Sequence, residues 1–119
     1  MGYAQRERGG DEFAAVGGRA GSTDLDRRRH RVAPHPWTWL RQVHGDRVVE
    51  VDAPGEWAGS EADAAVTTTI GAVLAVHTAD CAGVVLVGDG TDPVTGDAVR
   101  ALGVAHAGWR GLAGGSVTG

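Results

Sequence analysis

Short apolar runs separated by turn residues fill the chain from residue 37 to residue 105, and this pattern predicts strands rather than helices. Residues 37–43 and 47–51 are rich in aromatic and β-branched side chains. Between them stands His44-Gly45-Asp46, which has the composition of a turn. Two such runs joined by a short turn predict a β-hairpin with His44 at its tip.

Further runs continue the pattern toward the C-terminus. Residues 62–67 and 72–76 flank Gly71 and predict two strands, or one strand with a break. The β-branched run at 83–87 predicts a short buried strand, and residues 99–105 predict another. Residues 88–97 contain glycines, aspartates and a proline, so we expect a loop there.

Helical patterns are confined to residues 23–31 and to the residues after Trp109. Residues 1–36 hold few large apolar side chains and predict a poorly packed segment, with Pro34 and Pro36 marking its boundary with a domain at 37–119. We expect the basic run at 27–31 to be a solvated tail or helix face rather than a phosphate site. About six short strands with little helix, in mixed order, predict an α/β (α+β layered) fold.

Composition narrows the classes of function. The 119-residue chain has a net charge of −4, which argues against a nucleic-acid partner. The single cysteine excludes an intrachain disulfide. No apolar run approaches the roughly 20 residues that span a bilayer, and the N-terminus lacks the apolar core of a secretory signal. The expected location is therefore cytoplasmic, without a membrane partner.

Three residues with metal-binding side chains stand at predicted strand ends: His44, Cys81 and His106. Two imidazoles and a thiolate are a plausible zinc set that leaves a fourth position open, as catalytic zinc sites do. The long, irregular spacing is not a zinc-finger signature. A cysteine is commonly just a small core residue, and a histidine at a strand end is commonly solvated, so the residues alone leave both interpretations open.

The same atoms allow a second chemistry. Cys81 is a candidate nucleophile with His44 or His106 as its base and with Asp80 orienting that base. Asp80 is more plausible as a residue that supports a metal ligand than as a ligand itself, because neighbouring residues in an extended segment point to opposite faces. His77, four residues before Cys81, is a weaker candidate ligand.

Trp109 and Arg110 follow His106 closely and are candidates for a substrate pocket. An indole offers a stacking face and a guanidinium offers a fork for phosphate. The alternative is a core position for Trp109 and simple exposure for Arg110.

Four motifs follow one another along the chain: Gln42-Val43-His44-Gly45, Glu61-Ala62-Asp63-Ala64, Thr78-Ala79-Asp80-Cys81 and His106-Ala107-Gly108-Trp109-Arg110-Gly111. Their order resembles that of the laccase-domain (YfiH-like) proteins, also called polyphenol oxidoreductase or purine nucleoside phosphorylase family proteins, which include the peptidoglycan editing factor. The similarity covers about residues 37–117, and members of the family are longer than this chain.

The resemblance implies the β-rich N-terminal part of a layered α/β fold and a zinc ion held by His44, Cys81 and His106. It implies phosphorolysis of purine nucleosides (adenosine, inosine, guanosine, methylthioadenosine) and deamination of adenosine, with nucleoside and phosphate as partners. Gln42 joins Arg41, Trp109 and Arg110 as a predicted substrate-binding residue.

Copper is a less favoured cofactor than zinc. A multicopper centre needs more imidazoles than the five histidines of this chain, two of which lie before residue 37. Two other functions stay open. One is a Cys81-dependent hydrolase of a peptidoglycan precursor, and the other is a truncated, non-catalytic remnant. The sequence leaves the oligomeric state undetermined.

Overall fold

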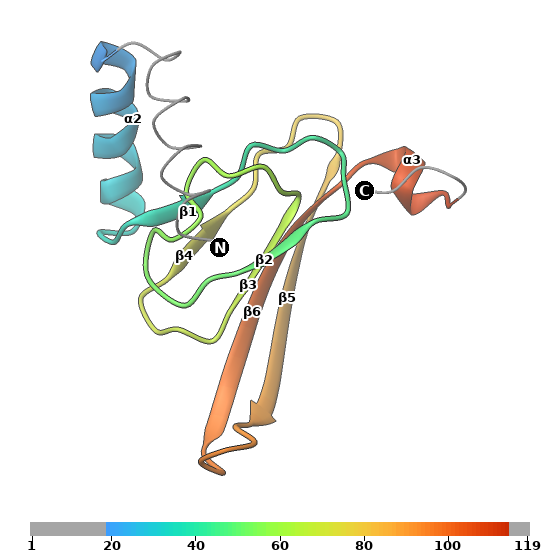
Figure 1. Ribbon diagram of the computed structural model, residues 1–119. Helices are drawn as coiled ribbons and strands as arrows, with labels where there is room; N and C mark the ends of the chain where they lie inside the picture. The colour runs from blue at the N-terminus through green and yellow to red at the C-terminus, as the bar shows by residue number, and fades with distance from the viewer. Residues whose placement is uncertain (1–18, 115–119) are drawn as a thin grey trace.

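The computed structural model describes residues 19–114, with side chains from residue 24 onward. Within that range two helices and six strands follow one another along the chain (Figure 1). They are α2 (Arg19–Val32), β1 (Trp37–Trp39), β2 (Val48–Glu50), β3 (Ala64–Thr67), β4 (Val73–Ala75), β5 (Ala82–Thr91), β6 (Ala98–Ala107) and α3 (Trp109–Leu112). The mixed, strand-rich architecture confirms the predicted fold class.

The strands form two sheets. In the smaller one β1 pairs parallel with β4, from Trp37 opposite Val73 to Trp39 opposite Ala75. The larger has the order β2-β3-β6-β5, with β2 and β3 parallel and the other neighbours antiparallel. The runs at 62–67 and 72–76 are therefore two strands, and they belong to different sheets.

The predicted hairpin around His44 is wrong. β1 and β2 lie in different sheets, and each pairs with a strand that comes later in the chain. Residues 40–47 cross between the sheets instead of turning back. Backbone N–H groups that a hairpin ladder would use are bonded to the carboxylate of Asp63, as described below.

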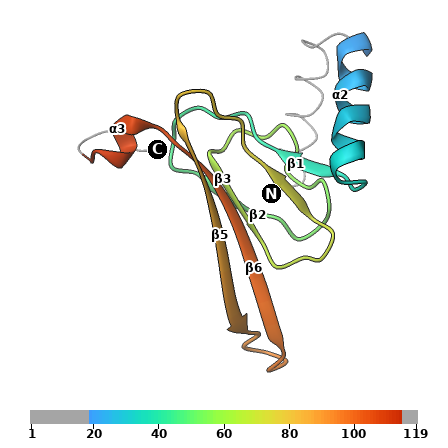
Figure 2. The ribbon, with the colours of Figure 1, turned by 180° about the vertical axis from the view of Figure 1, so that it is seen from behind.

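Strands β5 and β6 form a long arm that extends away from the rest of the molecule (Figures 1 and 2). They pair from Ala82 opposite Ala107 to Thr91 opposite Ala98, so the loop expected at 88–97 begins only after Thr91. Its glycines and aspartate are accommodated because the strand is solvated and needs no apolar face. The Asp92 carboxylate accepts hydrogen bonds from the N–H groups of Val94 and Thr95 and closes the tip.

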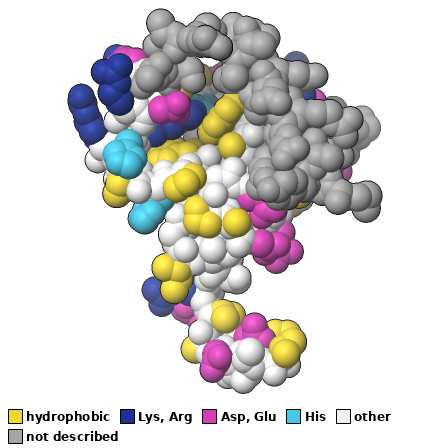
Figure 3. Space-filling view, turned by 60° about the vertical axis from the view of Figure 1, so that its left-hand side comes forward, with side chains coloured by type: hydrophobic (Ala, Val, Ile, Leu, Met, Phe, Trp, Pro, Cys, Tyr) yellow, Lys and Arg dark blue, Asp and Glu magenta, His cyan; other side chains and the backbone are white. Residues whose placement is uncertain are grey.

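The prediction that residues 83–87 are buried is also wrong. Val85, Leu86 and Val87 are 72%, 60% and 63% exposed. Their strand is the edge of its sheet, and the described residues include no element that covers it. Figure 3 shows apolar side chains at the surface along this arm.

A small apolar core joins the two sheets. Its buried residues are Leu40, Val49, Val51, Ala62 and Ala65. Buried hydroxyls are paired: Thr38 donates to the carbonyl of Glu56 and Thr67 to that of Val51. The first bond joins β1 to the loop after β2, and the second joins the end of β3 to the residue after β2.

Helix α2 confirms the helix predicted at 23–31 and carries the basic run on a largely exposed surface. Arg29 is the exception, because its guanidinium lies over the rings of Trp37 and Trp39. Neither helix in residues 19–114 has the length and apolarity required to cross a bilayer.

Candidate metal centre

His44, Cys81 and His106 converge at one end of the larger sheet. His44 lies in the crossing loop between β1 and β2, Cys81 directly precedes β5, and His106 is near the end of β6. One ligand atom from each lies within 4.8 Å of the others. Cys81 Sγ is 3.5 Å from His44 Nε2, and the two imidazoles meet edge to face at a centroid distance of 4.6 Å.

Pairing of β5 with β6 explains how Cys81 and His106 come together. Gly83 lies opposite His106 in the ladder, so Cys81 is only two residues beyond the paired position. Two segments separated by 25 residues in the sequence are thereby held side by side. Because the ladder is continuous along ten residue pairs, its register places these two side chains at the same sheet end.

Asp63 holds the third residue, His44, in place. One carboxylate oxygen accepts hydrogen bonds from the backbone N–H groups of Val43 and Gly45, at 3.1 and 2.8 Å. The other oxygen accepts from His44 N at 2.9 Å. Three successive N–H groups thus enclose one carboxylate, as in an anion-binding nest. His44 has a φ of 58°, in the left-handed region that residues other than glycine rarely adopt, and the three hydrogen bonds stabilise this conformation.

The same carboxylate orients His106. Asp63 Oδ1 lies 2.8 Å from His106 Nδ1, and both side chains are almost fully buried. An ionised carboxylate can only accept, so Nδ1 carries the proton and Nε2 keeps its lone pair for a ligand. Carboxylate–histidine pairs of this kind support metal ligands in many proteins.

Asp63 is ionised in this setting. Burial by itself raises the pKa of the carboxyl group. The hydrogen bonds from His106 and from the N–H groups of Gly45, Val43 and His44 outweigh burial, so the pKa lies below its ordinary value. The centre therefore has a fixed negative charge behind His106.

Gly108 leaves room for the His44 ring. A Cβ atom at this position would lie 2.9 Å from His44 Cδ2. The backbone of Gly108 has φ −75° and ψ 150°, which any residue adopts, so only the close approach requires glycine here.

We expect Gly108→Ala to displace the His44 ring and to weaken metal binding at the cluster by about tenfold, at a cost of about 1 kcal/mol in stability. Competition with a chromophoric zinc chelator measures the affinity. The matched control is Gly88→Ala in β5, where an added Cβ meets nothing within 4 Å. Equal zinc affinity in both variants would refute the steric role of Gly108.

The donor set suits a borderline metal ion. Thiolate and imidazole ligands are those that zinc prefers, and three protein ligands leave a position for substrate. His44 is exposed, Cys81 is half-buried and His106 is buried, so the cluster is open on one side. The three residues fit a metal ion, and their chemistry favours zinc without excluding copper.

Other predicted residues lie around this cluster. Asp80 Oδ1 is 3.9 Å from Cys81 Sγ and the side chain is exposed. His77 lies outside the cluster. Gln42 bonds both backbone groups of His77, at 2.7 and 2.6 Å, and so anchors the segment that leads to Cys81.

The predicted substrate-binding arginines differ in their surroundings. Arg41 forms an ion pair with Glu61 at 3.1 Å. Arg110 lies 4.9 Å above the ring of Trp109, which is 69% exposed. Trp109 is therefore not a core residue, and its pair with Arg110 is on the surface just after His106.

The sequence patterns did not predict that Asp63 orients His44 and His106, or that Gly108 leaves space for the His44 ring. Asp63 lies in the motif Glu61-Ala62-Asp63-Ala64, where an acid between small apolar residues opens a buried strand. That pattern signals a paired carboxylate, because burying an unpaired one is too costly. The tight approach of Gly108 to His44 has no signal in the sequence.

Comparison with known proteins places this site in context. Residues 10–118 match the model of the multi-copper polyphenol oxidoreductase laccase family. A purine nucleoside phosphorylase of Xylella fastidiosa is 51% identical over 85 residues, covering 67% of this chain and 28% of the relative. One from Streptomyces coelicolor is 41% identical over 109 residues, covering 91% and 40%.

The purine nucleoside phosphorylase YfiH of Escherichia coli is 42% identical over 83 residues, which is 69% of this chain and 30% of that protein. The chain thus spans well under half the length of these relatives. The family match begins at residue 10 and so includes the segment before residue 37. Because this match covers nearly the whole chain, the chain belongs to the multi-copper polyphenol oxidoreductase laccase family.

Proposed function

We propose that this chain carries the metal site of a zinc-dependent purine nucleoside phosphorylase that also deaminates adenosine. Adenosine, inosine, guanosine and methylthioadenosine are the proposed nucleosides. The observation that carries the proposal is the open cluster of His44, Cys81 and His106, within 4.8 Å of one another. The similarity to purine nucleoside phosphorylases supports the reaction class.

His44, Cys81 and His106 would hold the ion. Zinc, when bound, supplies a Lewis acid that polarises an oxygen of phosphate or water. Asp63 keeps His106 in the tautomer whose Nε2 is free to ligate, and its bonds to residues 43–45 fix the approach of His44. These residues preorganise the site, so little reorganisation accompanies substrate binding.

Trp109 and Arg110 are the proposed contacts for the nucleoside and phosphate. The exposed indole offers a face on which a purine stacks, an interaction worth about 1–3 kcal/mol. Arg110 offers a guanidinium fork to an anion. Arg41 is less available to phosphate because it forms an ion pair with Glu61. In phosphorolysis, phosphate replaces the purine at the ribose carbon, so positioning of these two groups determines the rate.

Zinc content and phosphate dependence together test the proposal. We expect purified protein to hold about one zinc per chain and to release hypoxanthine from inosine only when phosphate is present. Chelation is expected to stop release and added zinc to restore it. Protein that neither contains nor takes up zinc would contradict the proposal. Zinc without turnover would instead indicate a metal-binding, non-catalytic remnant.

A Cys81-dependent hydrolase of a peptidoglycan precursor is the second candidate function. One contact favours it: Cys81 Sγ lies 3.5 Å from His44 Nε2, within the range of a thiol and its base in a substrate-free site. This hydrolase keeps its activity after chelation and loses it on thiol alkylation. Metal-dependent phosphorolysis is lost under both treatments.

A further inference from the structure

A hollow of about 340 Å³ lies between helix α2 and strand β1. Its lining shares no residue with the metal cluster or with the Trp109–Arg110 pair. The volume is at the lower end of the range of small-molecule sites. We infer that this hollow is a second binding site, which takes a small planar aromatic compound carrying a negative charge.

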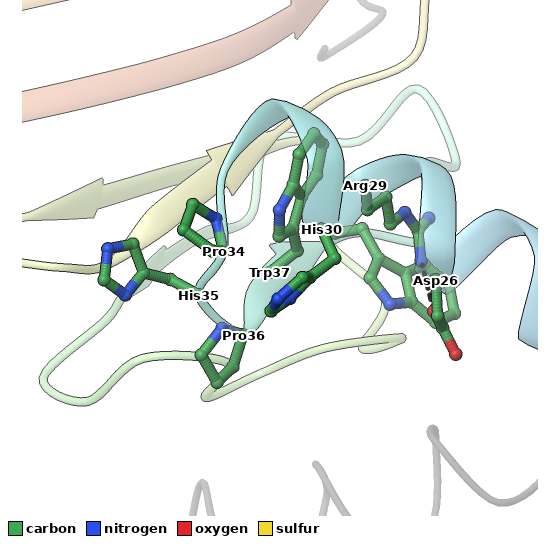
Figure 4. Close-up of a pocket in the computed structure, with 8 residues that line it drawn as sticks. Asp26, Arg29, His30, Pro34, His35, Pro36 and Trp37 are labelled. Atoms are coloured by element: carbon green, nitrogen blue, oxygen red, sulfur yellow. Dashed lines mark ion pairs between the residues drawn. The ribbon is translucent and has the colours of Figure 1, made fainter.

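Flat apolar side chains form its walls. Trp37, Trp39, Pro34 and Pro36 line the side contributed by β1 and the segment before it (Figure 4). Indole faces and proline rings are the surfaces against which a planar ring stacks. A planar aromatic ligand fills such a hollow better than a branched aliphatic one.

These walls are held in place by neighbouring groups. Trp37 Nε1 donates to the carbonyl of Ala33 at 3.1 Å. Pro36 packs so closely on Gly55 that a Cβ there would lie 2.8 Å from Pro36 Cβ. A site whose walls are fixed before binding loses less entropy when the ligand enters.

Arg29 supplies the charge that selects an anion. Its guanidinium carbon lies 5.9 Å from the Trp37 ring centre and 5.3 Å from that of Trp39. The Arg29 side chain is only 14% exposed, and its Nη1 is 3.6 Å from Asp26 Oδ1. This distance is longer than a hydrogen bond, and the Asp26 side chain is largely solvated. A ligand carboxylate can therefore replace Asp26 beside the guanidinium.

The surrounding charge acts in the same direction. Residues 24–32 hold four arginines and two aspartates, a net charge of +2 on the helix that forms one wall. His30 and His35 also line the hollow and offer polar ring atoms. Aromatic walls beside a cation therefore match a ligand that combines a ring with a negative group.

Calorimetric titration of the whole chain tests each half of this inference. The probes are 2-naphthoate, 2-naphthyl phosphate, cyclohexanecarboxylate and neutral 2-naphthol. Either aryl anion should bind at submillimolar concentration. It should bind at least about tenfold more tightly than cyclohexanecarboxylate, which lacks an aromatic ring, or 2-naphthol, which lacks a charge. The ratio of carboxylate to phosphate affinity identifies the kind of anion. No binding of either aryl anion at about 1 mM would overturn the inference.

Matched variants locate the binding. Arg29→Gln should weaken the aryl anions by about tenfold and leave 2-naphthol unchanged. The control is Arg28→Gln, because Arg28 is exposed, pairs with Asp24 and does not line the hollow. Equal losses in the two variants would overturn the inference, since they would show attraction by the helix charge alone.

Two further variants separate the hollow from other sites. Trp39→Leu should abolish binding of the aryl anions, with circular dichroism checking that the chain stays folded. Cys81→Ala should leave binding unchanged, because Cys81 is outside the hollow. Loss of binding in Cys81→Ala would place the ligand at the metal centre and overturn the second site. The proposed phosphorylase activity has no part in these measurements.

Discussion

Replacing Asp63 by asparagine is expected to lower the free energy of unfolding by about 3 kcal/mol and to weaken zinc binding at least about tenfold. Each oxygen of this carboxylate faces two N–H donors: Oδ1 meets His44 N and His106 Nδ1, and Oδ2 meets Val43 N and Gly45 N. An asparagine amide has only one acceptor oxygen. In either orientation its NH₂ group therefore points at two donors and leaves them unpaired.

Urea unfolding of the metal-free protein measures the stability change, and competition with a zinc chelator measures the affinity. The control is Asp80→Asn, since Asp80 is exposed and 3.9 Å from the thiol, so its loss should alter either quantity little. Nitrogen chemical shifts of His106 separate positioning from general stability. They should report a proton on Nδ1 in the wild type and a mixture of tautomers in Asp63→Asn. A variant with wild-type stability and affinity would refute the role of Asp63.

Local pattern predicted where strands occur but not which strands pair. The runs at 37–43 and 47–51 do contain β1 and β2, yet each pairs with a partner 15 or more residues further along the chain. Hairpin composition favours a turn at His44, whereas the bonds from residues 43–45 to Asp63 hold an open loop. Such long-range polar contacts leave no periodicity in the sequence.

The arm shows the same limit for burial. A β-branched run predicts an interior strand because such side chains commonly fill a core. Val85 and Val87 are nevertheless exposed, since β5 is an edge strand on an extended hairpin. The composition of a strand shows that its side chains can be buried. Whether they are buried depends on how the other elements pack against that strand.

The candidate centre was more predictable than the fold around it. His44, Cys81 and His106 are reactive side chains at strand ends, and the structure brings them together. The positioning roles of Asp63 and Gly108 were not predicted, because each acts on another residue rather than on a ligand. Motif spacing identifies metal-binding side chains, whereas the groups that orient them depend on tertiary contacts.

Replacing Cys81 by alanine is expected to reduce zinc affinity at least about 100-fold. Loss of a side chain that only hydrogen-bonds to a metal ligand already costs about 10- to 100-fold, and Cys81 is itself a proposed ligand. Cys81 is the only cysteine in the chain, and two imidazoles on one open face hold zinc weakly. Nucleoside phosphorolysis should be lost with the metal. The control is His77→Ala, whose exposed side chain lies four residues before Cys81 and outside the cluster.

Loss of activity in Cys81→Ala is also the result that a cysteine nucleophile predicts, so the companion variant is His106→Ala. His106 belongs to the cluster, while the thiol's observed imidazole contact is with His44. A metal centre requires zinc and phosphorolysis to fall together in both variants. A thiol nucleophile with His44 as its base requires iodoacetamide reactivity and hydrolysis to persist in His106→Ala protein freed of zinc. Persistence of hydrolysis there would assign the chemistry to Cys81 and not to the metal.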